Sequence, residues 1–106
     1  MVSYVPATMA MLEAFLGYRP QQTIKAWVVR KDKPVAIMGF TFGKIITVFS
    51  DYKGGLTPRE ILAAGRFLMG NATQYPAVYA IGEYEGTLLK HLGFKHLEGE
   101  TYIWDN

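Results

Sequence analysis

The sequence predicts a domain of the α/β or α+β class that is built on one mixed β-sheet. Three apolar runs rich in β-branched residues follow one another between residues 24 and 49 and predict an antiparallel meander. A capped helix start follows at Thr57, and strand-like and helix-like segments alternate after it. The predicted order is therefore helix, three-stranded meander, helix, strand, helix and strand.

The composition is that of a single domain over residues 1–106. Hydrophobic residues make up 50% of the chain and charged residues 19%, which excludes a disordered chain. The absence of cysteine excludes disulfides, zinc–thiolate sites and a cysteine nucleophile. A net charge of +2 is too small to argue for nucleic acid, and no apolar run is long enough to span a membrane. The first residues also lack the basic region of a secretory signal, so we expect a soluble, cytoplasmic protein.

The first residues predict an edge strand followed by one helix. Residues 2–5 are strand-like, and Pro6 ends the strand. Thr8 can cap a helix that runs to about Leu16, where Gly17 stops it. The apolar stripe of this helix consists of Met9, Leu12, Phe15 and Leu16.

The meander consists of three strands joined by two reversals. Strands are predicted at 24–29, 35–40 and 45–49, with a turn at 31–34 and a reversal at Gly43. Any β-meander has this pattern, so it says nothing about function by itself.

The next segment predicts a turn and then a well-defined helix start. Residues 51–56 are turn-forming. Thr57 can accept a hydrogen bond from the Glu60 amide, Pro58 suits the first helical position, and Glu60 can reach back to the cap. The helix is expected to end at 70–71, with an apolar face formed by Ile61, Leu62, Ala64, Phe67 and Leu68.

The C-terminal third predicts a strand, a helix and a closing β segment. The strand covers 77–81, and the helix covers 85–92 with Gly93 as its stop. Residues 94–97 and 100–104 alternate between apolar and polar, which allows either one bent strand or a small hairpin. We expect the 45–49 and 77–81 strands to be parallel neighbours, because a helix connects them through a right-handed crossover.

Several segments in this order point to a known family. They are the opening 5–8, the hairpin 26–29 with 35–39, the strand–loop–helix 47–69, and the leucine–glycine–phenylalanine ending of 88–94 followed by tyrosine and tryptophan at 102 and 104. Together they cover nearly the whole chain. They resemble the GNAT superfamily of acyl-CoA-dependent N-acyltransferases, and most of all its small phage-encoded members.

The resemblance implies a mixed, mostly antiparallel sheet with helices on both faces and a splayed pair of parallel strands. In this superfamily the pantetheine arm of acetyl-CoA pairs with the backbone where the two strands part, and its pyrophosphate meets the following turn and helix start. The chain is thus expected to be an N-acetyltransferase that uses acetyl-CoA as co-substrate. The acceptor would be the amine of a small molecule or of a protein.

The expected cofactor site departs from the superfamily pattern. An ungapped alignment places Leu56 and Pro58 where small residues belong; Pro58 has no amide to donate, and Leu56 blocks a close backbone approach. A one-residue gap places Gly55 and Thr57 there instead. The alternative is an ordinary exposed turn followed by a structural cap. The resemblance gives Val48, Phe49, Ser50, Lys53, Gly54, Gly55, Thr57 and Arg59 as the cofactor-binding residues.

The catalytic residues of the superfamily are also replaced. Its usual tyrosine acid corresponds to Leu89, and its asparagine to about Gly82. Tyr79, Glu83 and Tyr84 lie where the thioester is expected, with Glu83 as a candidate base and Tyr84 as a candidate acid. The alternatives are a helix-start carboxylate and a half-buried tyrosine.

Three further expectations concern ligands and partners. The two histidines, His91 and His96, have no carboxylate at metal-ligand spacing, so no metal site is predicted. One helix of the superfamily is missing before residue 24, so the acceptor is large or a second subunit of a homodimer completes the site. Phe40, Tyr102 and Trp104 are candidates for a dimer face or, alternatively, for packing on the sheet.

Two other functions compete with catalysis. The first is a non-catalytic interaction or phage structural protein on the same fold, with a degenerate CoA cradle. The second, with less support, is nucleic-acid binding through the cations around the meander, which a solvated hairpin also explains. These cations are Lys25, Arg30, Lys31, Lys33 and Lys44.

Overall fold

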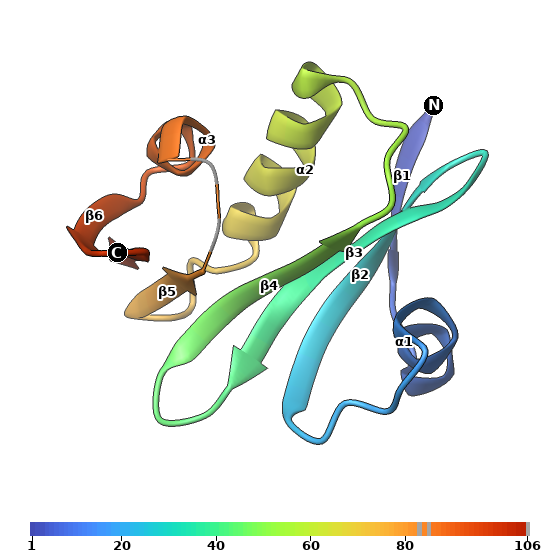
Figure 1. The fold of residues 1–106 in the computed structure, drawn as a ribbon, viewed down its shortest axis with the longest axis horizontal. Coiled ribbons are helices and arrows are strands. Elements are labelled where there is room, and N and C mark those ends of the chain that lie inside the picture. Colours follow the sequence, from blue (N-terminus) through green and yellow to red (C-terminus); the bar gives the residue numbers. More distant parts are fainter. Residues whose placement is uncertain (83, 85, 106) are drawn as a thin grey trace.

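The computed structural model describes residues 1–82, 84 and 86–105 and shows a seven-stranded sheet with three helices among them (Figure 1). The elements are β1 (Val2–Pro6), α1 (Met9–Leu16), β2 (Thr23–Lys31), β3 (Lys33–Phe42), β4 (Ile46–Tyr52), α2 (Pro58–Gly70), β5 (Ala77–Ile81), α3 (Gly86–His91), β6 (Lys95–Glu98) and β7 (Thr101–Asp105). The prediction of a mixed, mostly antiparallel α+β domain is confirmed.

The strands lie in the order β1-β2-β3-β4-β5-β7-β6. All neighbours are antiparallel except β4 and β5, which are parallel, as predicted. Of the two alternatives for the last segment, the structure has the hairpin, formed by β6 and β7. The last strand lies between β5 and β6 and joins the hairpin to the rest of the sheet.

The helix caps form as their sequences predict. The Thr8 hydroxyl accepts a hydrogen bond from the Met11 amide at 3.2 Å, and Gly17 ends α1 with a φ of 83°. Thr57 and Glu60 form a reciprocal capping box at the start of α2, with Pro58 as the first helical residue. Helix α3 is shorter than predicted among the described residues, and Glu85, its predicted first residue, lies outside them.

One segment was predicted wrongly. Asp51 and Tyr52 were expected in a turn, but they extend β4, because β3 is long enough to pair with them. Asp51 lies opposite Ile37, and Tyr52 lies opposite Ala36. The predicted turn is therefore confined to the residues from Lys53 onward, which changes where the side chains before it point.

Two hydrophobic cores lie on opposite faces of the sheet. Helix α1 covers one face, where Leu12 packs with buried residues of β2 and β3. Helices α2 and α3 cover the other face, and Figure 1 shows them on the opposite side of β4 from α1. The centre of this second core is Phe40, which is 0% exposed and packs edge-on against Trp27 and Tyr75. Phe40 therefore belongs to the core and cannot form a dimer face.

Neither of the other two candidates for a dimer face is fully exposed. Tyr102 and Trp104 are half-buried and pack against the same core. Tyr102 lies near Gly86, the first residue of α3, and Trp104 lies near Gly93, which follows the helix. None of the described helices is both long and apolar enough to cross a bilayer.

Candidate functional site

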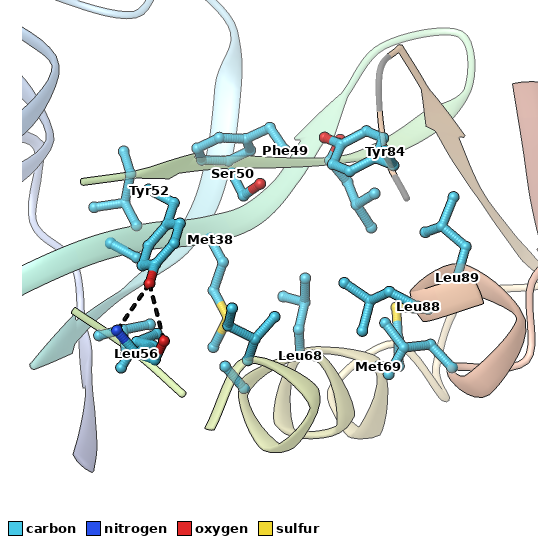
Figure 2. A pocket seen from close by; sticks show the side chains of 18 of the residues that line it. Met38, Phe49, Ser50, Tyr52, Leu56, Leu68, Met69, Tyr84, Leu88 and Leu89 are labelled. Atoms are coloured by element: carbon cyan, nitrogen blue, oxygen red, sulfur yellow. Dashed lines mark hydrogen bonds between the residues drawn. The ribbon is translucent and has the colours of Figure 1, made fainter. Parts of the chain in front are cut away.

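A cavity of about 250 Å³ lies between β4 and the two helices α2 and α3. Figure 2 shows side chains of Met38, Leu68 and Leu88 pointing into it. The lining is almost entirely apolar. The polar side chains that reach it come from Ser50, Tyr52 and Tyr84.

The cavity lies beside β4, the strand that pairs with β5 in parallel. Ladder pairing between β4 and β5 is confined, among the described residues, to Thr47 and Tyr79. Beyond this pair, Val48, Phe49, Ser50 and Tyr52 of β4 line the cavity. Helix α2 presents the small residue Ala64 to the cavity. At the neighbouring Gly65, Leu92, the residue after α3, packs closely, since an added Cβ would lie 2.7 Å from Leu92 Cδ1.

Tyr84 lies beside β4 at the edge of the cavity (Figure 2). Its hydroxyl donates to the Val48 carbonyl oxygen over 3.4 Å, which links the segment after β5 to β4. Burial raises the pKa of the Tyr84 hydroxyl, and a hydrogen bond with Ser50 opposes this shift. The phenol is therefore protonated at neutral pH and can act as a proton donor.

The opposite end of the cavity is closed by a contact between Tyr52 and Leu56 (Figure 2). The Tyr52 hydroxyl accepts a hydrogen bond from the Leu56 amide at 2.8 Å and donates to the Leu56 carbonyl at 3.3 Å. We call this pair the Tyr52–Leu56 clasp. It holds the half-buried Leu56 side chain against the cavity and occupies the backbone groups that precede α2.

The start of α2 is occupied by its own side chains. The Thr57 amide donates to Glu60 Oε1 at 2.9 Å, and the Glu60 amide donates to Thr57 Oγ1 at 3.2 Å. Lys31 Nζ lies 2.7 Å from the same Glu60 oxygen. The hydrogen bond from Lys31, and next the one from the Thr57 amide, lower the pKa of the Glu60 carboxyl. A carboxylate therefore lies where a phosphate would meet the helix.

The predicted cradle before α2 faces elsewhere. Lys53 Nζ lies 4.7 Å from the centre of the Phe15 ring of α1, and the Lys53 amide donates to the Val35 carbonyl at 2.8 Å. Gly54 and Gly55 have φ values of 96° and 103° and line a shallow surface depression together with Lys53. That depression is separate from the apolar cavity, whose lining includes none of these three residues.

The structure thus brings together part of the predicted site. Val48, Phe49, Ser50 and Tyr84 all line the cavity. Tyr79 lies on the opposite face of the sheet, because Val78 and Ala80 on either side of it belong to the core under α2. Glu83 lies outside the described residues. The predicted residues outside the cavity lining are Lys53, Gly54, Gly55, Thr57, Arg59 and Tyr79.

Sequence reasoning missed Tyr52 as a cavity residue. Strand alternation was the available signal: once Tyr52 is counted in β4, it shares a face with Val48 and Ser50. The turn-forming composition of residues 51–56 hides this alternation in the sequence.

The charge of Glu60 predicts a pH dependence of stability. Because the folded pKa of Glu60 is below its ordinary value of 4.5, the stabilisation is complete above that value and is lost as the pH falls through the folded pKa. We expect Glu60→Gln to flatten the fall in melting temperature between about pH 6 and about pH 3. Thermal unfolding followed by circular dichroism measures this. Glu98→Gln, at an exposed residue of β6, is the matched control and should keep the wild-type slope; equal slopes in all three proteins would contradict the role of Glu60.

The described part of the chain gives no support for a metal site. No group of three histidine, aspartate or glutamate side chains there is arranged to hold a metal ion. Comparison of the chain with protein-family models, curated proteins and solved structures gives no match.

Proposed function

We propose that the protein is an N-acyltransferase that binds an acyl thioester in the cavity beside β4 and transfers its acyl group to an amine. The observation that carries the proposal is the apolar cavity beside β4, where ladder pairing with β5 is confined to Thr47 and Tyr79 among the described residues and the Tyr84 hydroxyl bonds the Val48 carbonyl. The resemblance of the sequence to the GNAT superfamily supports it, because that superfamily binds acetyl-CoA between two parting strands.

The size of the cavity bears on the acyl donor. An apolar cavity of about 150 Å³ holds benzene, so 250 Å³ holds roughly ten non-hydrogen atoms by the same ratio. An acetyl group alone would leave most of this space empty. The apolar lining suits a pantetheine arm or a longer acyl chain, for which burial provides about 0.8 kcal/mol for each methylene.

The residues at the opening suit the chemistry of acyl transfer. The amine nitrogen attacks the thioester carbonyl carbon, a C–N bond forms, and the C–S bond breaks. The amine loses a proton and the leaving thiolate gains one. We propose the Tyr84 hydroxyl as the donor to the thiolate, because it lines the cavity and is protonated at neutral pH. The predicted base, Glu83, lies outside the described residues.

A second depression supports an acceptor on the other side of β4. It is lined by Gln21 and Gln22 from the loop after α1 and by Ser50 and Asp51 of β4. Phe49 and Ser50 also line the apolar cavity, so the two spaces meet at these two residues of β4. The Asp51 carboxylate can pair with the ammonium form of an amine, from either a small molecule or a protein.

Ligand-induced stabilisation tests the proposal. A thioester at ten times its Kd adds about 1.4 kcal/mol to the free energy of unfolding. For a domain of this size, that raises the melting temperature by roughly 6–11 °C. Thermal unfolding with acetyl and octanoyl thioesters, followed by release of free thiol in the presence of a panel of amines, measures binding and transfer. If no thioester shifts the melting temperature, the proposal is wrong.

The role of Tyr84 gives a separate prediction. We expect Tyr84→Phe to slow thiol release by roughly 100-fold to 10,000-fold, the usual contribution of a positioned acid, and to leave the Kd of the thioester nearly unchanged. Tyr79→Phe is the matched control, since Tyr79 lies on the opposite face of the sheet. Loss of transfer in Tyr79→Phe but not in Tyr84→Phe would reverse the assignment.

One observation favours a non-catalytic interaction module as a second candidate. Leu89 lies at the position of the superfamily's tyrosine acid and has no hydroxyl. Its side chain is 3% exposed and belongs to the core. Under this alternative the cavity is an incompletely filled core and binds no thioester. Failure of every thioester to bind would favour it.

A further inference from the structure

Resting on the proposed function, we infer that the site recognises the acyl and pantetheine parts of its thioester and gives the nucleotide phosphates no binding at the start of α2. The preferred donor is then any acyl pantetheine thioester, whether or not the pantetheine carries a nucleotide. Three features of the described residues lead to this inference.

The first feature is the occupation of backbone donors. A phosphate binds at a helix start through free amides. Here the Leu56 amide is bound by the Tyr52 hydroxyl at 2.8 Å, and the Thr57 amide by Glu60 at 2.9 Å. Pro58 has no amide hydrogen, and the Glu60 amide already donates to Thr57. Of the residues from Leu56 to Glu60, only Arg59 has an amide that is left for an anion.

The second feature is charge. The carboxylate of Glu60 lies at the helix start, and its lowered pKa keeps it ionised at neutral pH. Lys31 neutralises it through a contact of 2.7 Å. A phosphate placed at this end would meet the carboxylate and would compete with it for Lys31, so the helix dipole is already compensated.

The third feature is the direction of the Lys53 side chain, which is the basic side chain expected to bind the phosphates. Lys53 Nζ lies over the Phe15 ring at 4.7 Å, on the face of the sheet that α1 covers. The apolar cavity lies on the other face, under α2 and α3. Lys53 would have to leave Phe15 to reach a phosphate at the end of this cavity.

The test compares two donors that differ only in the nucleotide. Isothermal titration of the full chain with octanoyl-CoA and with octanoyl-pantetheine is expected to give Kd values within about three-fold of each other. A preference for octanoyl-CoA of about ten-fold or more would overturn the inference and leave the proposed function standing. If neither thioester binds, both the proposed function and the inference are overturned.

A double variant tests the cause. Tyr52→Phe frees the Leu56 amide, and Glu60→Gln removes the carboxylate charge. We expect the two changes together to strengthen octanoyl-CoA binding by roughly ten-fold relative to octanoyl-pantetheine, because a free amide and the helix dipole then face the phosphates. Tyr79→Phe, on the opposite face of the sheet from the cavity, is the matched control. An unchanged ratio in a double variant that still binds octanoyl-pantetheine would overturn the assignment, and loss of both ligands would show that the clasp shapes the cavity and does not exclude phosphate.

Discussion

Gly39→Ala is expected to destabilise the domain by about 3 kcal/mol or more, at the upper end of overpacking substitutions. Gly39 of β3 lies opposite Ala26 of β2, and an added Cβ would lie 2.2 Å from the Lys25 carbonyl oxygen and 2.7 Å from the Ala26 Cα. Both obstacles are backbone atoms, so no side chain can rotate away. The two longest strands of the sheet would have to separate at its centre.

The matched control is Gly70→Ala at the end of α2, where an added Cβ meets nothing within 4 Å. There alanine should be neutral or stabilise the helix by up to about 1 kcal/mol. Thermal unfolding measures both variants. A loss of 3 kcal/mol corresponds to a fall in melting temperature of roughly 12–24 °C for a domain of this size. Equal melting temperatures for the two variants would contradict the close approach of β2 and β3.

Local signals account for the parts of the fold that the sequence predicts well. The Thr8 cap, the Gly17 stop and the capping box of Thr57 and Glu60 each depend on a few consecutive residues, and each forms as expected. The end of β4 depends instead on pairing with β3, which is distant in sequence. Composition alone therefore placed Asp51 and Tyr52 in a turn, whereas the ladder holds them in the sheet.

The candidate site shows the same division. The resemblance placed Val48, Phe49 and Ser50 beside the ligand, and the structure puts all three at the cavity. The capping box predicts Thr57 and Glu60 at the α2 start. Tyr52 could not be foreseen there, because its position depends on how the chain turns after β4. The Tyr52 hydroxyl reaches the Leu56 amide only through that turn.

The direction of the side chains matters most for phosphate binding at the start of α2. The resemblance predicts a phosphate site at a basic residue that precedes two glycines and a helix start. In the structure, however, the Leu56 amide donates to the Tyr52 phenol and the Thr57 amide donates to the Glu60 carboxylate, so neither amide is free for a phosphate. Side-chain direction, which composition does not specify, therefore decides between the two outcomes.

Filling the cavity is the substitution that should change binding most. Ala64 lines the cavity from α2 and is 7% exposed, whereas its neighbour Ala63 is exposed on the same helix. Ala64→Leu places three more carbon atoms in the space that we assign to the ligand. If they exclude three to four methylenes of an octanoyl chain, at about 0.8 kcal/mol for each, binding weakens by on the order of 100-fold. Ala63→Leu should leave the Kd unchanged.

The free energies of unfolding of Ala64→Leu and Ala63→Leu test whether the space beside Ala64 is empty. A leucine that enters an empty apolar space is accommodated, so the free energy of unfolding of Ala64→Leu should lie within about 1 kcal/mol of the wild-type value. A leucine forced into a filled core costs about 1–3 kcal/mol. Isothermal titration with octanoyl-pantetheine and thermal unfolding of both variants therefore give two independent readings. Weakened binding with unchanged stability supports an acyl site beside β4, whereas lost stability in Ala64→Leu but not in Ala63→Leu identifies a packed core and removes the basis for acyl transfer.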